Sequence, residues 1–127
     1  MTDKQKVLII EDETALLYAL NAELSTAGFQ VLTSADGEEG LEQMKKNKPD
    51  FVVLDIWLPT MNGIEILEAR HQDAELKKIP VLVISNSGGE ETIAKAKELG
   101  VVDYLVKTDH SLEEITSKIK GILTNAR

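Results

Sequence analysis

The sequence predicts an α/β protein in which a five-stranded parallel sheet is covered by helices on both faces. The first observation is a set of short apolar runs, rich in Val, Ile and Leu, at positions 7–10, 31–33, 51–54, 81–84 and 104–106. Runs that do not alternate with polar residues are typical of strands buried on both sides. The second observation is that segments with helical spacing of apolar residues separate these runs. A strand followed by a helix, repeated five times, favours a doubly wound sheet.

The helices are predicted from their apolar stripes and their end signals. Two stripes are clearest: Leu16, Leu20 and Leu24 after the first strand, and Leu112, Ile115, Ile119, Ile122 and Leu123 near the end of the chain. Three pairs have the spacing of a capping box, namely Asp36 with Glu39, Ser87 with Glu90 and Ser111 with Glu114. The pair at 87 is the weakest because two glycines follow it. Gly28 and Gly100 are placed to end helices.

Length and composition indicate one globular domain. A chain of 127 residues can bury a hydrophobic core, and we expect residues 1–127 to form a single domain with its core at about 6–123. Apolar residues make up 43% and charged residues 28%, which is ordinary for a globular protein. No apolar run approaches the roughly 18 residues of a membrane span. The start, MTDKQKVLIIEDE, does not resemble a signal peptide, because acids follow its short apolar run.

The charge and the lack of cysteine exclude some functions. The net charge of −8 argues against a nucleic-acid-binding surface, which needs clustered Lys and Arg. The absence of cysteine excludes disulfides and thiol chemistry, and it is compatible with a reducing compartment. We therefore expect a cytoplasmic protein that neither inserts into a membrane nor binds nucleic acid directly.

Polar residues follow the predicted strands at the points where the strands end. Glu11 and Asp12 follow the first run, Asp55 ends the third, Ser85 ends the fourth and Lys107 ends the fifth. In open parallel sheets, ligands bind outside the carboxyl ends of the strands. One edge of the sheet should therefore gather three carboxylates, a hydroxyl and an ammonium group.

This combination of groups predicts a Mg²⁺-dependent phosphoryl acceptor. Three close carboxylates repel one another unless a cation is present, and Mg²⁺ suits a shallow site with oxygen ligands. With that charge neutralised, one carboxylate can attack phosphorus, and Asp55 is the best candidate because it lies on a central strand. Lys107 would pair with the phosphoryl oxygens, and Ser85 would donate a hydrogen bond to one of them.

Several stretches in order, VLIIEDE, FVVLDIWLPTMNGIE, VLVISNS and GVVDYLVK, resemble the receiver domain of two-component response regulators over essentially the whole chain. The resemblance implies a flavodoxin-like fold with strand order 2-1-3-4-5. It also implies roles for individual residues: Asp55 as phosphoacceptor, Glu11 and Asp12 as the acidic metal-binding pair, the backbone carbonyl of Trp57 as a further Mg²⁺ ligand, Ser85 and Tyr104 as the switch hydroxyl and aromatic, and Lys107 as the phosphate-binding lysine.

The resemblance further implies a signalling role rather than turnover of an external substrate. A sensor histidine kinase or a phosphotransfer protein would supply the phosphoryl group. Ser85 would then move inward and Tyr104 would pack behind it, which reshapes the surface of the fourth helix, fifth strand and fifth helix for a downstream protein. Trp57 and Ser87, two residues beyond Asp55 and Ser85, would control the water that hydrolyses the acyl phosphate.

The sequence departs from the family pattern at two positions. Family members usually have a cis proline after the lysine, whereas Thr108 stands here. A cis bond before a non-proline residue costs about 2.5–4 kcal/mol, so the resemblance does not fix the geometry of the Lys107–Thr108 bond. Glu11 replaces the commoner aspartate, and its longer side chain would reach the metal or its waters differently.

Alternatives to this interpretation exist for the residues and for the whole chain. Asp55 could be a solvated strand end, the acids at 11 and 12 could favour the next helix through its dipole, and Lys107 could lie on the surface. The chain could be a pseudo-receiver, an interaction module that does not use phosphate. A haloacid-dehalogenase-type phosphohydrolase would need an aspartate where Trp57 stands, and a flavodoxin-like electron carrier would need a Ser/Thr/Gly-rich loop after the first strand. Gly63 is expected to supply a backbone geometry closed to other residues.

Overall fold

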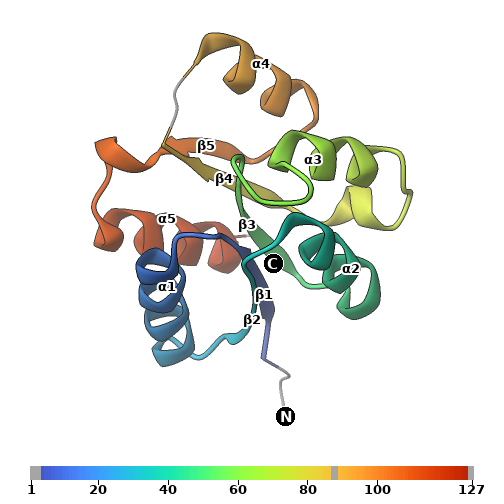
Figure 1. The fold of residues 1–127 in the computed structure, drawn as a ribbon. Helices are drawn as coiled ribbons and strands as arrows, with labels where there is room; N and C mark the ends of the chain where they lie inside the picture. The colour runs from blue at the N-terminus through green and yellow to red at the C-terminus, as the bar shows by residue number, and fades with distance from the viewer. Residues whose placement is uncertain (1–3, 87–88, 126–127) are drawn as a thin grey trace.

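A five-stranded parallel sheet forms the centre of the molecule. The computed structural model describes residues 4–86 and 89–125. The strands are β1 Lys6–Ile10, β2 Gln30–Ser34, β3 Phe51–Asp55, β4 Val81–Ser85 and β5 Asp103–Val106. They lie in the order β2-β1-β3-β4-β5, and each neighbouring pair is parallel (Figure 1). The predicted fold and strand order are confirmed, and each predicted run lies inside an observed strand.

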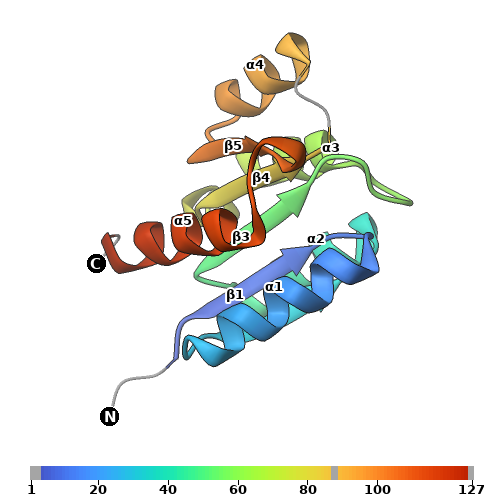
Figure 2. The same ribbon diagram turned by 90° about the vertical axis from the view of Figure 1, so that its left-hand side faces the viewer.

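Helices cover both faces of the sheet. The α-helices are α1 Thr14–Thr26, α2 Gly37–Asn47, α3 Gly63–His71, α4 Glu90–Glu98 and α5 Leu112–Asn125, and two short 3₁₀ turns are η1 Leu76–Lys78 and η2 Lys107–Asp109. Helices α1 and α5 pack on one face, and α2, α3 and α4 pack on the other (Figure 2). None of the described helices is long and apolar enough to cross a membrane.

The two faces of the sheet carry two separate apolar cores, and the continuous apolar runs explain this arrangement. Alternate residues of one strand point to opposite faces. In β3, Val52 and Leu54 therefore join the core under α2, α3 and α4, whereas Phe51 and Val53 join the core under α1 and α5. All five residues of β3 and all five of β4 are buried. A strand with this double burial leaves no place for alternating polar residues.

The helix ends mostly follow the predicted signals. Ser111 and Glu114 form the reciprocal hydrogen bonds of a capping box, and Asp36 accepts the Glu39 N–H at the start of α2. Gly28 and Gly100 have φ of 101° and 87° just beyond α1 and α4, where a left-handed residue ends the helix. The predicted cap at Ser87 lies outside the described residues.

One further capping box was not predicted. Asn62 accepts the N–H of Glu65 at 2.9 Å, and the Glu65 carboxylate accepts the N–H of Asn62 at 3.1 Å. This box starts α3 directly after the loop that follows β3. The sequence NGIE has the required spacing, but the glycine inside it hid the signal, as glycine is a poor residue for a first helical turn.

The register of the strands brings the candidate residues to one edge. Ile10 pairs with Leu54, so Glu11 and Asp55 leave neighbouring strands side by side. Asp55 pairs with Ile84, and Ser85 pairs with Val106 one step further on. The chain order reverses between β1 and β3, which is where open α/β sheets form their ligand sites.

Candidate functional site

Three carboxylates converge at the carboxyl edge of β1 and β3. One carboxylate oxygen from each of Glu11, Asp12 and Asp55 lies within 4.8 Å of the other two. Glu11 has no exposed surface and Asp55 has 3%, whereas Asp12 is exposed. The cluster therefore has a buried floor and one ligand at the surface, which suits a partly hydrated cation.

Lys107 reaches into this cluster from the end of β5. Its Nζ lies 2.8 Å from Glu11 Oε1, 3.2 Å from Asp55 Oδ2 and 3.4 Å from Glu13 Oε1. Only 8% of its side chain is exposed. Burial by itself would lower the pKa of Lys107, but contact with Glu11 and Asp55 outweighs burial and raises that pKa. Lys107 therefore stays charged and compensates two buried carboxylates.

Glu11 is the most strongly perturbed group of the site. Its Oε2 accepts the Glu13 N–H at 2.9 Å. Its Oε1 is buried and, among the described residues, accepts no hydrogen bond, although the Lys107 ammonium lies in contact as an ion pair. Burial raises the pKa of Glu11 from 4.5 to about 7, and the Lys107 contact offsets part of that rise. A buried carboxylate oxygen that lies in an ion pair with Lys107, without a hydrogen bond of good geometry, can also accept a divalent cation.

Asp55 ends β3 and faces both Lys107 and the following loop. Its Oδ1 accepts a long hydrogen bond of 3.4 Å from the backbone N–H of Trp57, while its Oδ2 contacts Lys107. The Trp57 side chain is 59% exposed beside it. Asp55 thus presents one oxygen to the ammonium and the other to the loop that carries Trp57.

Gly63 is required for a different reason from the one predicted. Its φ is not positive, so the prediction of a special backbone geometry was wrong. A Cβ at this position would lie 2.5 Å from the carbonyl oxygen of Asp55 and 2.8 Å from Cα of Ile56. The Gly63 N–H also donates to the Ile56 carbonyl at 2.7 Å. Glycine is needed because the start of α3 lies directly against the chain that follows Asp55.

Ser85 and Tyr104 lie on the neighbouring strands. Ser85 ends β4 with no exposed surface, next to the end of β5. Tyr104 is 9% exposed and belongs to the core under α2, α3 and α4. It pairs with Val83, two residues before Ser85. The two predicted switch residues therefore occupy adjacent strands, with Ser85 at the carboxyl edge that carries the acidic cluster and Tyr104 two residues before that edge.

Thr108 in place of proline does not displace the lysine. No peptide bond in the described ranges 4–86 and 89–125 is cis, so the Lys107–Thr108 bond is trans. The chain continues from β5 into the turn η2, and Lys107 still contacts Glu11 and Asp55.

The sequence analysis missed one residue of this site. Glu13 is an exposed residue that contacts Lys107 at 3.4 Å and donates its N–H to Glu11. It is the third acid of the run EDE after β1. That run was the available signal, but neither spacing nor composition says that its third member turns back toward β5.

Comparison with known proteins agrees with this geometry. The family model of the response regulator receiver domain matches residues 7–120. The chain is 34% identical over 119 residues to the alkaline phosphatase synthesis transcriptional regulatory protein PhoP of Bacillus subtilis, covering 94% of this chain and 48% of that protein. The chain therefore spans about half the length of the curated relatives it matches.

Solved structures share the fold at similar identity. The phosphorylated cyanobacterial phytochrome response regulator RcpA superposes with a TM-score of 0.81 at 30% identity, covering 94% of this chain and 91% of that one. The Mn(2+)-bound form of the response regulator Rcp1 superposes with a TM-score of 0.80 at 27% identity, covering 93% and 91%.

The sheet order 2-1-3-4-5 and the acidic cluster at its carboxyl edge define a flavodoxin-like α/β protein with a site suited to a divalent cation. The family match makes the class specific. The chain belongs to the response regulator receiver domain family, the signalling domains of two-component systems.

Proposed function

We propose that this receiver accepts a phosphoryl group on Asp55 in the presence of Mg²⁺ and passes the signal on as a change of surface. The observation that carries the proposal is the convergence of the Glu11, Asp12 and Asp55 carboxylates within 4.8 Å, with the Lys107 ammonium 3.2 Å from Asp55. An acceptor carboxylate, a cation site and a fixed positive charge are the groups that phosphoryl transfer to an aspartate needs.

The residues that would hold Mg²⁺ are Glu11, Asp12, Asp55 and the backbone carbonyl of Trp57. Support comes from the buried Oε1 of Glu11, whose contact with Lys107 is an ion pair without good hydrogen-bond geometry, and from Rcp1, which binds Mn²⁺ in its crystal structure. When bound, Mg²⁺ would neutralise the acidic cluster and the charge on the phosphoryl oxygens. Because burial raises the pKa of Glu11 to about 7, the Glu11 carboxyl group would release its proton on binding the cation.

The transfer step uses Asp55 as the nucleophile. One of its oxygens forms a bond to phosphorus, and the bond from phosphorus to the donor breaks. In a phosphohistidine donor that bond is P–N, and its electron pair stays on the imidazole nitrogen. Lys107 is already 3.2 Å from Asp55, so it can move its contact to the phosphoryl oxygens without leaving the site. RcpA, a related response regulator, has been crystallised in a phosphorylated form.

The output would pass through Ser85 and Tyr104 to the face formed by α4, β5 and α5. Ser85 ends β4 beside β5, so its hydroxyl can follow a phosphoryl oxygen on Asp55. Inward movement of Ser85 would let Tyr104 pack behind it and shift the balance between two surface shapes. The partner on the input side would be a sensor histidine kinase or phosphotransfer protein in the cytoplasm, and the partner on the output side a downstream protein.

The signal would be erased by hydrolysis of the acyl phosphate rather than by turnover of an external substrate. The exposed side chain of Trp57 stands two residues beyond Asp55, where it can shield the phosphorus from water. Ser87, the second residue proposed for this role, lies outside the described residues. We also propose that residues 1–127 act as a single receiver domain, with the core at about 6–123.

The proposal is tested with the single tryptophan as a probe. The fluorescence of Trp57 is titrated with Mg²⁺, and beryllofluoride is then added as a mimic of an aspartyl phosphate. We expect a saturable change with Mg²⁺ and a second change that Asp55→Asn abolishes. Labelling of Asp55→Asn by acetyl phosphate at the wild-type level would contradict the assignment of Asp55.

One outcome would favour the pseudo-receiver alternative. In that case the chain binds Mg²⁺ but responds to neither beryllofluoride nor acetyl phosphate. Direct calorimetry of Mg²⁺ binding separates this case from a tryptophan that is silent because it is exposed. If calorimetry also detects no Mg²⁺ binding, phosphoryl transfer is excluded as the function of the site.

A further inference from the structure

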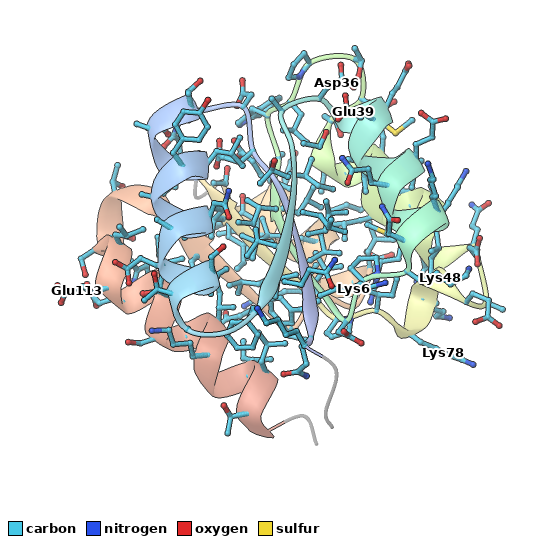
Figure 3. All side chains as sticks on the ribbon, turned by 90° about the horizontal axis from the view of Figure 1, so that it is seen from below. Lys6, Asp36, Glu39, Lys48, Lys78 and Glu113 are labelled. Carbon is cyan, nitrogen blue, oxygen red and sulfur yellow. The ribbon has the colours of Figure 1, made fainter. Side chains whose placement is uncertain are left out.

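The first turn of α2 is capped mainly by the loop that follows β3. The Gly37 N–H donates to the Pro59 carbonyl at 3.0 Å, and the Glu38 N–H donates to Thr60 Oγ1 at 3.0 Å. Of the first three N–H groups of α2, only that of Glu39 is capped by the residue directly before the helix, since it donates to Asp36 Oδ1 at 3.0 Å. Figure 3 shows Asp36 and Glu39 at this end of α2, opposite Lys48. Helix α2 therefore begins on the loop of residues 56–62, which we call the β3–α3 loop.

Thr60 is the residue that ties this loop to α2. Its Oγ1 accepts the Glu38 N–H and donates to Asp36 Oδ1 at 2.8 Å. The N–H of Glu39 and then the Thr60 hydroxyl hold the pKa of Asp36 below its usual range, so the acceptor is a carboxylate. Thr60 has φ of 67°, a left-handed conformation that a β-branched residue seldom adopts. Its surroundings must therefore impose this conformation on it.

Two glycines allow α2 to lie in direct contact with the two segments that carry the proposed metal ligands, the end of β1 and the β3–α3 loop. A Cβ on Gly37 would lie 1.7 Å from the carbonyl oxygen of Met61, in the β3–α3 loop that also carries Trp57. A Cβ on Gly40 would lie 2.8 Å from side-chain carbons of Ile10, the residue before Glu11. The start of α2 thus lies against the chain on both sides of the site.

Ser34 completes the connection on the β1 side. Its hydroxyl donates to the Asp36 carbonyl at 2.9 Å, and its own carbonyl accepts the Glu11 N–H at 2.9 Å. Ser34 is 3% exposed. A continuous set of hydrogen bonds therefore runs from Glu11 through Ser34 and Asp36 to Thr60.

We infer that Thr60 is a positioning residue for the divalent cation, because its hydroxyl fixes the β3–α3 loop to Asp36 and so holds the Trp57 carbonyl in place. The inference rests on the proposed function, in which that carbonyl binds Mg²⁺. A backbone carbonyl cannot turn independently of its loop, and Mg²⁺ demands nearly ideal octahedral geometry. Residues that orient the metal ligands without touching the metal themselves strongly affect the affinity for the metal.

The test compares Mg²⁺ affinity in three variants, measured by Trp57 fluorescence and by calorimetry. Thr60→Val removes the hydroxyl at constant shape and should raise the Mg²⁺ Kd about tenfold. Thr60→Ser restores the hydroxyl and should restore the affinity. Thr26→Val is the matched control, since Thr26 is an exposed residue at the far end of α1. Its Kd should equal that of the wild type.

A second variant guards against a general loss of fold. Thr60→Gly removes the hydroxyl but adopts φ of 67° without strain, so it keeps the loop conformation accessible. It should also bind Mg²⁺ more weakly. At saturating Mg²⁺, Thr60→Val and Thr60→Gly should both be labelled by acetyl phosphate at the wild-type rate, because Asp55 and Lys107 are unchanged.

The inference is overturned if Thr60→Val and Thr60→Gly bind Mg²⁺ with the wild-type Kd. It is also overturned if acetyl phosphate labels both variants more slowly than the wild type at saturating Mg²⁺. Absence of Mg²⁺ binding in the wild type would instead refute the proposed function, and the inference with it. The wild-type titration thus separates the two failures.

Discussion

The Lys107 ammonium lies 2.8 Å from Oε1 of Glu11, a carboxylate with no exposed surface. Each group makes the charge of the other tolerable, since an unpaired buried charge is costly. Yet burial still raises the pKa of Glu11 to about 7, so Lys107 compensates for the burial only in part. The receiver therefore keeps a buried carboxyl group whose charge Lys107 compensates only in part.

The raised pKa of Glu11 predicts a fall in stability between about pH 5 and pH 7. In this window the folded chain keeps a proton on Glu11 that the unfolded chain, with a pKa near 4.5, has released. Stability therefore falls as pH rises and levels off above about pH 7. The full effect is at most about 3 kcal/mol, from 1.36 kcal/mol per pKa unit.

Urea unfolding of the wild type and Glu11→Gln at several pH values without Mg²⁺ checks this slope. The difference in free energy of unfolding between the two proteins isolates Glu11 from the other carboxylates. We expect the variant to gain on the wild type as the pH rises from 5 to 7. A difference that does not change with pH would show that Glu11 has an ordinary pKa in the folded chain.

Lys107→Met should destabilise the free protein more at high pH than at low pH. Near pH 6 most Glu11 side chains are already protonated, so losing the ammonium leaves Asp55 as the main unpaired buried carboxylate. Near pH 8 the variant must either bury the Glu11 carboxylate without the Lys107 ammonium or take up a proton. This costs about 2 kcal/mol more than at pH 6. Urea midpoints at the two pH values measure this. Equal losses at both would contradict the coupling, and Mg²⁺ should recover part of the loss at pH 8.

The fold was predictable because several independent signals agreed. The apolar runs without alternation predicted double burial, which β3 and β4 show in full. The edge strand β2 is only partly buried, although Val31 and Leu32 pack against the two cores. Gly28 ends α1 in a left-handed conformation, and the capping box at Ser111 starts α5, as the sequence predicted. The strand order came from the family resemblance, since periodicity alone does not fix which strands are neighbours.

The site was predictable at its centre but not at its surroundings. The rule that ligands gather at the carboxyl ends of parallel strands brought Glu11, Asp55 and Lys107 together without knowledge of distances. Glu13 was missed because its position depends on the turn after β1. The ties between α2 and the β3–α3 loop were missed because they join segments about 22 residues apart in sequence, such as Thr60 and Glu38. Such contacts depend on tertiary packing rather than on a local pattern.

Arg70 should be among the most sensitive positions outside the site. It is 4% exposed, and each of its three guanidinium nitrogens donates to a backbone carbonyl: Nε to Ile79, Nη1 to Leu99 and Nη2 to Lys77. It thereby joins α3 to the chain before β4 and to the end of α4. Arginine is almost never fully buried unless it is paired, and only the tertiary structure reveals the burial of Arg70.

Arg70→Met should lower the free energy of unfolding by about 3 kcal/mol, because three carbonyls lose their donors. Arg70→Lys should recover little, since one ammonium cannot reach three separate acceptors in the way a planar guanidinium does. The control is Lys95→Met on α4, whose exposed ion pair with Glu68 at 3.8 Å contributes little. Urea unfolding decides, and equal losses for Arg70→Met and Lys95→Met would contradict a structural role for the buried guanidinium.

Three helical glycines should respond in opposite ways to alanine. In the interior of a helix alanine is normally better by about 1 kcal/mol. Gly121→Ala in α5 should gain roughly that amount, because a Cβ there meets nothing within 4 Å. Gly40→Ala should lose about 1–3 kcal/mol, since its Cβ would overlap the side chain of Ile10, which can shift only a little. Gly37→Ala should lose the most, since the Met61 carbonyl belongs to the backbone of the loop beside the site. Thermal unfolding of the three variants should rank them Gly121→Ala, Gly40→Ala, Gly37→Ala in decreasing Tm. A Gly37→Ala variant as stable as the wild type would show that α2 and the β3–α3 loop are not held in close contact.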